Sequence, residues 1–193
     1  GPLDCQLVFS HDGIRFARGA RQPFVEVGPP GSAIGGAVQP SCLVETESEM
    51  RIYSSASTVQ HGQGRDARRR GLQPGSITLH TLRRDGLTFL EPEGAQGHFV
   101  SKPLVLQAPR LTVNAAAPHG EVRFQLSDIE SRPIEGFTFD DCQPLNAIDS
   151  VDFEVTWADV DLASVTGKIV RLEAQLQHAQ LFAIRGQFHF IDA

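Results

Sequence analysis

The sequence has few of the residues that mark several functional classes. Its 193 residues include three cysteines, one tryptophan, one tyrosine and two lysines. The cysteines form no C-x-x-C motif and have no histidine at ligand spacing, so a structural zinc site is not expected. No apolar run approaches the roughly 18 residues that cross a bilayer, and residues 1–4 lack the basic-then-apolar layout of a signal peptide. A membrane partner is therefore not expected.

The charge balance argues against nucleic acid. Seventeen basic and twenty-three acidic residues give a formal charge of −6, which repels a phosphate backbone unless a local patch overrides it. The one basic cluster, Arg65, Arg68, Arg69 and Arg70, lies among glycines and has no aromatic residues between its arginines for base stacking. Such a cluster is either a solvated loop or a contact for an anion or a partner.

Short runs of alternating apolar and polar residues dominate the chain. They include residues 122–126, 151–157 and 170–176, in which β-branched and aromatic residues are common. Each run presents one apolar face to a core and one polar face to water, as antiparallel sheets do. No segment shows a sustained period of 3.6 residues. The sequence therefore predicts an all-β fold, and the last residue of the second run, Trp157, is expected in the core.

Two segments repeat one pattern, Ser10 to Phe16 and Arg83 to Phe89, each with a central Asp-Gly pair. One interpretation is two ordinary type I′ hairpins, and the other is equivalent corners of successive propeller blades. Proline, glycine and charge interrupt the strand pattern at residues 91–94. We therefore expect a propeller-blade-like hairpin region over residues 1–92 and a jelly-roll-like antiparallel β-sandwich over residues 93–193.

Several short motifs resemble one family of bacterial proteins. The segment Leu7–Arg18 resembles their S-x-D-G-x-x-(F/W)-x-R motif, and residues 82–86 resemble their L-R-R-D-G hairpin. Residues 50–53, followed by His61 and Gly62, resemble a strand that bears a tyrosine and a nearby histidine. Residues 97–183 resemble a carboxy-terminal β-sandwich. The family has a five-bladed β-propeller similar to glycoside hydrolase families 32 and 43, and the resemblance implies that this chain is the last blade and the sandwich.

The resemblance implies a non-catalytic accessory domain of a carbohydrate-active protein, which supports a propeller or binds glycan weakly. Such hydrolases place carboxylates on several inner propeller strands, and this chain could supply only the last blade or so. Asp12 and Asp85 are better explained as turn residues, whose short carboxylates support their own backbone, than as catalysts. No catalytic residue is assigned. The alternatives are a structural module that forms homo-oligomers through open strand edges, and a glycoside hydrolase completed by other blades or chains.

The resemblance also supplies the candidate carbohydrate-binding residues, Tyr53, His61 and Arg51, because that place in the family lies toward the ligand face of the propeller. Asp140, Asp141 and Asp149 cluster around an expected turn and could hold a structural calcium ion, although regular D-x-D-x-D spacing is missing. No other cofactor is expected. Because glycan-active proteins of this kind are often exported, the resemblance implies an extracellular or periplasmic location.

Overall fold

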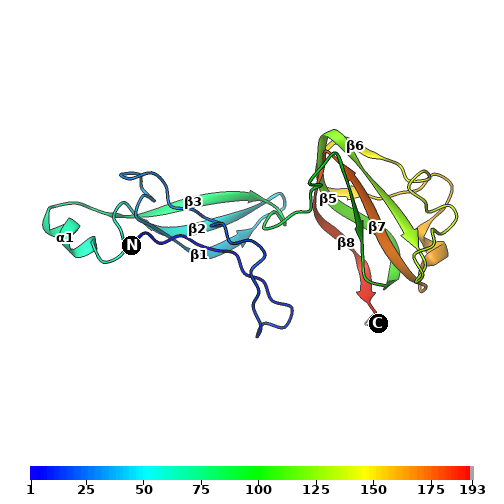
Figure 1. Cartoon of the computed structure of the whole chain (residues 1–193), viewed down its shortest axis with the longest axis horizontal. Coiled ribbons are helices and arrows are strands. Elements are labelled where there is room, and N and C mark those ends of the chain that lie inside the picture. Colours follow the sequence, from blue (N-terminus) through cyan, green and yellow to red (C-terminus); the bar gives the residue numbers. More distant parts are fainter. Residues whose placement is uncertain (192–193) are drawn as a thin grey trace. The chain divides into compact units, whose positions relative to one another are not determined.

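The computed structural model describes residues 1–191, which form two compact units (Figure 1). The first unit contains residues 1–84, and the second begins at Asp85. The sequence pattern placed the division between residues 92 and 93, a few residues further along the chain. Within the described residues, neither helix has the length and apolar character that a membrane crossing requires. The protein is all-β, as predicted.

The first unit is built on a three-stranded antiparallel sheet. It contains β1 (Ala37–Glu45), β2 (Glu49–Ser57) and β3 (Gly75–Arg83), in the order β1-β2-β3, and the short helix α1 (Gly64–Arg69) lies between β2 and β3 in the chain. The side chains of β2 alternate between buried and exposed. One face of the sheet is therefore covered, by a small core that contains Val38, Met50, Ile52 and Ala56, and the other face is open.

The two Asp-Gly segments adopt different turns. The carboxylate oxygen Oδ1 of Asp12 accepts hydrogen bonds from the backbone N–H groups of Ile14 and Arg15, both at 2.8 Å. These bonds, first that from Arg15 and then that from Ile14, lower the pKa of Asp12. Asp12 therefore supports its own backbone, as predicted. The carboxylate of Asp85 instead contacts Arg185 and Asn114.

Neither segment forms the expected type I′ turn, because a type I′ turn needs positive φ at both central residues. In the first segment only Gly13 has a positive φ, of 72°, and in the second only Asp85 has one, of 55°. The chain around Asp12 is a wider loop, since Phe9 and Ala17 bridge each other across it. The hairpin interpretation is therefore wrong in its turn geometry.

The second unit is the β-sandwich. Its strands are β4 (Gln96–Val100), β5 (Leu104–Ser127), β6 (Leu145–Glu154), β7 (Ile169–Gln177) and β8 (Gln180–Phe190), and a short helix, η1 (Leu162–Val165), precedes β7. The sheet order is β4-β7-β5-β6, and β8 pairs with β5. All pairs are antiparallel, including β5 with β7, in which residues 121–127 oppose residues 177–171. The sheet curls around a core (Figure 1).

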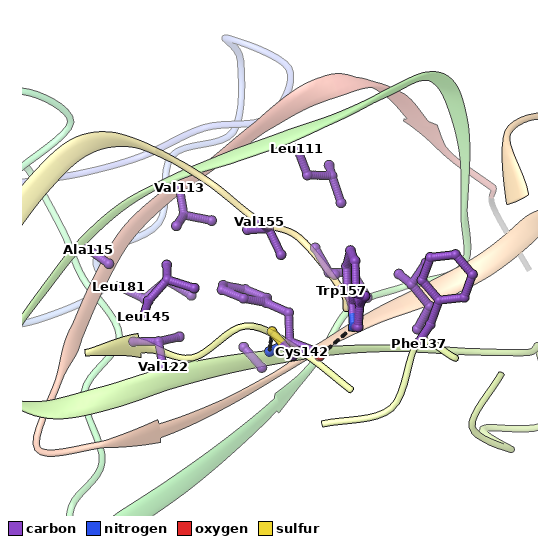
Figure 2. Packing of buried hydrophobic residues seen from close by; sticks show 14 of the residues in the cluster. Leu111, Val113, Ala115, Val122, Phe137, Cys142, Leu145, Val155, Trp157 and Leu181 are labelled. Carbon is purple, nitrogen blue, oxygen red and sulfur yellow. Dashed lines mark hydrogen bonds between the residues drawn. The ribbon is translucent and has the colours of Figure 1, made fainter. Parts of the chain in front are cut away.

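Alternating residues of β5 and β7 fill that core. Val122, Phe124 and Leu126 have no exposed surface, and Val170 and Ala174 of β7 belong to the same buried cluster. Trp157 lies in the core, as predicted, and its indole N–H donates to the backbone oxygen of Phe124 at 3.1 Å. Figure 2 shows the Phe137 ring beside Trp157, with ring centroids 5.2 Å apart. The indole is therefore fixed by both packing and a hydrogen bond.

The three cysteines are free, and they differ in environment. Cys142 is buried in the sandwich core (Figure 2), where its sulfur accepts a hydrogen bond from the Phe124 backbone N–H. Burial raises the pKa of its thiol. Cys42 is exposed on β1, and Cys5 is half-buried. Of the three thiols, that of Cys42 is therefore the most accessible to solvent.

We expect Phe124→Ala to lower the free energy of unfolding of the second unit by about 3–5 kcal/mol, because the large side chain leaves a cavity in a fully buried site. The measurement is urea denaturation followed by the fluorescence of Trp157. The matched control is Ile129→Ala, a truncation of a half-exposed side chain in the same unit, which should change stability by less than about 0.5 kcal/mol. Equal losses in both variants would contradict the core assignment.

Candidate functional site

A cleft of about 240 Å³ lies in the first unit, on the open face of the sheet. Residues from three segments line it: the beginning of β1, the end of β2, and the loop that leads to α1. They are Leu3, Ala37, Gln39, Ser55, Ala56, Ser57, Val59, Gln60, His61, Gly62 and Gly64. The cleft therefore combines hydroxyl, amide and imidazole groups with a set of small apolar side chains.

The strand register explains why the polar groups converge. Gln39 pairs with Ser55, and Ala37 pairs with Ser57, across β1 and β2. Directly opposed residues of an antiparallel pair project their side chains on the same face. The alternation along β2 therefore places Ser55 and Ser57 on the face that also carries Tyr53 and Arg51.

The loop after β2 is held against the end of the sheet. The Ser57 hydroxyl donates to the Val59 backbone oxygen at 2.8 Å and accepts from the Val59 N–H at 3.2 Å. The Gly36 N–H donates to the backbone oxygen of Ser57 at 2.8 Å. A Cβ on Gly36 would collide with the Val59 backbone, so only glycine lets the loop approach so closely. These contacts give the cleft a fixed wall.

The structure places the three predicted carbohydrate-binding residues differently. His61 is an exposed residue that lines the cleft. Tyr53 lies on the same face of β2, one alternation before Ser55, and is partly exposed. Arg51 lies one alternation further away, where its Nε donates to the Glu49 carboxylate at 2.6 Å. His61 is therefore in the cleft, Tyr53 is beside it, and Arg51 has an acidic partner of its own.

The predicted calcium ligands do not share one loop. Asp141 lies in a turn, where its Oδ2 accepts from the Thr138 N–H at 3.1 Å and from the Thr138 hydroxyl at 2.7 Å. Asp140 precedes it and is exposed, whereas Asp149 lies on β6 opposite Ala116. Among residues 1–191, no three His, Cys, Asp or Glu side chains are grouped as metal ligands would be. The calcium site stays a prediction.

A second groove, of about 400 Å³, lies in the second unit between residues of β4 and β8. Its lining is almost entirely apolar and includes Phe89, Phe99, Phe182 and Phe188, with Thr88 and Ser101 as the polar members. The Phe89 and Phe182 rings contact each other, with centroids 5.4 Å apart. So few donors and acceptors suit an apolar contact better than the many hydroxyls of a sugar.

The outer face of β7 carries a buried carboxylate. Glu173 is only 4% exposed, and its Oε2 lies 2.8 Å from Nε2 of His98, which comes from the neighbouring strand β4. The His98 ring also meets the edge of Phe139, at a centroid distance of 5.7 Å. A buried carboxylate needs such a partner, because an unpaired one is costly. We therefore assign Glu173 and His98 a structural role, the stabilisation of the sheet.

The residues that sequence reasoning missed are Gln39, Ser55, Ser57 and Gln60. A signal for two of them was present, since the alternation of β2 already placed Ser55 and Ser57 beside Tyr53. The register between β1 and β2, which brings Gln39 to Ser55, includes a shift between Pro40 and Cys42. A proline within a strand is typical of such a bulge, but it does not show which residues then pair across the two strands.

Searches against protein-family models, curated proteins and solved structures found no match for this chain. A functional proposal therefore has to rest on the resemblance of the short sequence motifs and on the geometry and chemistry of the residues themselves.

We expect His98→Ala to lower the free energy of unfolding of the second unit by about 1–3 kcal/mol, because Glu173 would keep a buried carboxylate without its imidazole partner. Urea denaturation measures the loss, and His189→Ala, at an exposed position on β8, is the control. In a double-mutant cycle, Glu173→Gln should recover part of the loss. Additive effects of the two changes would show that the pair is not coupled.

Proposed function

We propose that this chain is a non-catalytic accessory module of a carbohydrate-active protein, which supports a neighbouring propeller and binds glycan weakly at the cleft of the first unit. The observation that carries the proposal is the composition of the cleft. Its polar members, Gln39, Ser55 and His61 among them, surround small apolar residues such as Ala37 and Val59.

The chemistry of this lining suits a sugar ring. A pyranose has hydroxyls that both donate and accept hydrogen bonds, and serine hydroxyls and glutamine amides can do the same. Its C–H surfaces can pack on the alanine and valine side chains. At about 240 Å³ the cleft is smaller than the roughly 300–1,000 Å³ of typical drug-sized sites. This size favours contact with one sugar unit and weak affinity.

The open face beside the cleft extends this surface. Tyr53 pairs with Leu79 across β2 and β3, and Ser55 pairs with Ile77. Ile77 is 81% exposed, so the face carries apolar side chains next to the polar cleft. An oligosaccharide that leaves the cleft along β2 would pass over Tyr53, whose ring offers a flat apolar surface and a hydroxyl.

We expect glycan binding to perturb Tyr53. Because the chain has a single tyrosine, 3-fluorotyrosine gives one ¹⁹F resonance, which reports on this face during titration with neutral plant and microbial oligosaccharides. His61→Ala should weaken binding about five- to tenfold, by loss of a hydrogen-bonding group worth ~1 kcal/mol, as measured by calorimetry.

His119→Ala is the matched control, an exposed histidine of the second unit, and should leave the affinity unchanged. Equal affinities in the two variants would show that the cleft is not the site. Flat titrations across the whole panel would leave only the supporting role of the module.

A second candidate function, self-association through an open strand edge, is favoured by β3. Within the described residues β3 pairs only with β2, and it exposes Ile77 and Leu79. An unpaired edge with exposed apolar side chains is a template for pairing with another chain.

We expect light scattering across a concentration series to show association that Ile77→Lys with Leu79→Lys abolishes, because charges on an edge strand oppose pairing. The control is Leu72→Lys, at an exposed position outside the sheet. A monomer at every concentration would rule out this function.

A further inference from the structure

The charge of the chain is divided unevenly between its two units. Residues 1–84 contain ten basic and seven acidic side chains, a formal charge of +3, whereas the rest of the chain contains seven basic and sixteen acidic ones, a formal charge of −9. Four of the ten basic residues of the first unit lie within residues 65–70. Arg65, Arg68, Arg69 and Arg70 therefore form a local positive patch on a protein that is acidic overall.

This patch is carried by α1, which is anchored to its unit by one side chain. Ala67 is the buried residue of the helix, and Arg65, Arg68 and Arg69 are exposed. Arg70, which follows the helix, is also exposed. Figure 1 shows α1 beyond the end of the sheet at which β2 ends and β3 begins. The arginines are thus displayed to solvent at the end of the sheet that holds the cleft.

Most of these arginines have no acidic partner. Arg69 lies 3.6 Å from Asp66, and both side chains are about 70% exposed, so this ion pair is weak. Arg65, Arg68 and Arg70 make no ion pair within the described part of the chain. A guanidinium stays charged at any physiological pH and offers donors that match the two oxygens of a carboxylate. The patch therefore has unused capacity for a carboxylate-bearing ligand.

The patch adjoins the cleft. Gly64 is both a lining residue of the cleft and the first residue of α1, and Arg65 follows it directly. Neighbouring Cα atoms are ~3.8 Å apart, so the long arginine side chain begins at the edge of the cleft. Arg68 follows Arg65 by three residues, which places the two on the same side of the helix. A ligand in the cleft is therefore within reach of a fixed positive charge.

We propose that the cleft and the arginines of α1 together form a site for an acidic glycan, in which a sugar ring occupies the cleft and its carboxylate binds Arg65 and Arg68. This inference rests on the proposed function and specifies its ligand class. A nucleic acid fits the patch less well, because unpaired bases need aromatic stacking surfaces that the cluster lacks.

The test compares a charged ligand with its neutral counterpart. Calorimetry at about 50 mM salt measures trigalacturonate against galactotriose, and we expect trigalacturonate to bind about tenfold more tightly. The preference should shrink at about 500 mM salt, where exposed charges are screened over a few ångströms. Equal affinities would overturn the inference and leave the proposed function standing, whereas binding of neither ligand would overturn both the inference and the glycan-binding part of the proposed function.

Substitutions test whether Arg65 and Arg68 cause the preference for trigalacturonate. Arg65→Gln with Arg68→Gln should abolish the preference for trigalacturonate and leave galactotriose binding unchanged. Arg15→Gln with Arg18→Gln removes the same charge from another exposed loop of the unit and should preserve the preference. Arg65→Lys with Arg68→Lys keeps the charge but loses the planar donor pair, so this variant should retain part of the preference.

Circular dichroism confirms that each variant is folded. Loss of the preference in both glutamine variants would show a general charge effect and overturn the assignment to α1. So would an oligodeoxynucleotide of the same charge that binds as tightly as trigalacturonate, since the patch would then be a contact for any polyanion.

Discussion

Strand β5 pairs with three other strands, β6, β7 and β8, and the structure of the second unit depends on these pairings. Of its 24 residues, those from 104 to 116 pair with β8 and those from 112 to 122 pair with β6, whereas β7 pairs with residues 104–105 and again with residues 121–127. One continuous strand can serve both sides of the curled sheet only if its register shifts, and irregularities occur along all three of its pairings. At Gly120 a Cβ would collide with the backbone oxygen of Gln177, so glycine is required where β5 passes the end of β7.

The alternation of apolar and polar residues predicted the fold class and much of the core. Phe124 and Val170 could be assigned to the core because every second side chain of a strand lies on the same face of the sheet. The pairing of β5 with β7 could not be predicted, since alternation within a strand does not indicate which other strand lies beside it. Asp85 shows a second limit: an Asp-Gly pair predicts a turn, but only the tertiary structure directs its carboxylate to Arg185.

The sequence indicated only some of the residues of the candidate site. His61 and Tyr53 were named from a resemblance, and the structure places one in the cleft and the other beside it. The cleft itself needs Gln39, which comes from another strand, and Gly36, which lets the loop approach. Such a site is a product of register and of backbone proximity, and a single sequence carries little information about either. The arginine cluster differs, because its charge could be recognised in the sequence. Only the structure shows that it lies beside the cleft, and the proposed role depends on that position.

The order in which the strands are made differs from the order in which they pair. Among the described strands β8 comes last in the sequence, yet it pairs with β5, and its Leu181 also bridges Leu90. During synthesis on the ribosome, the edge of β5 that pairs with β8 would therefore stay unpaired until β8 has emerged. The strands of the first unit pair with their immediate successors, so that unit can fold while the rest is still being translated. Removal of the last residues of β8 should consequently harm the second unit far more than the first.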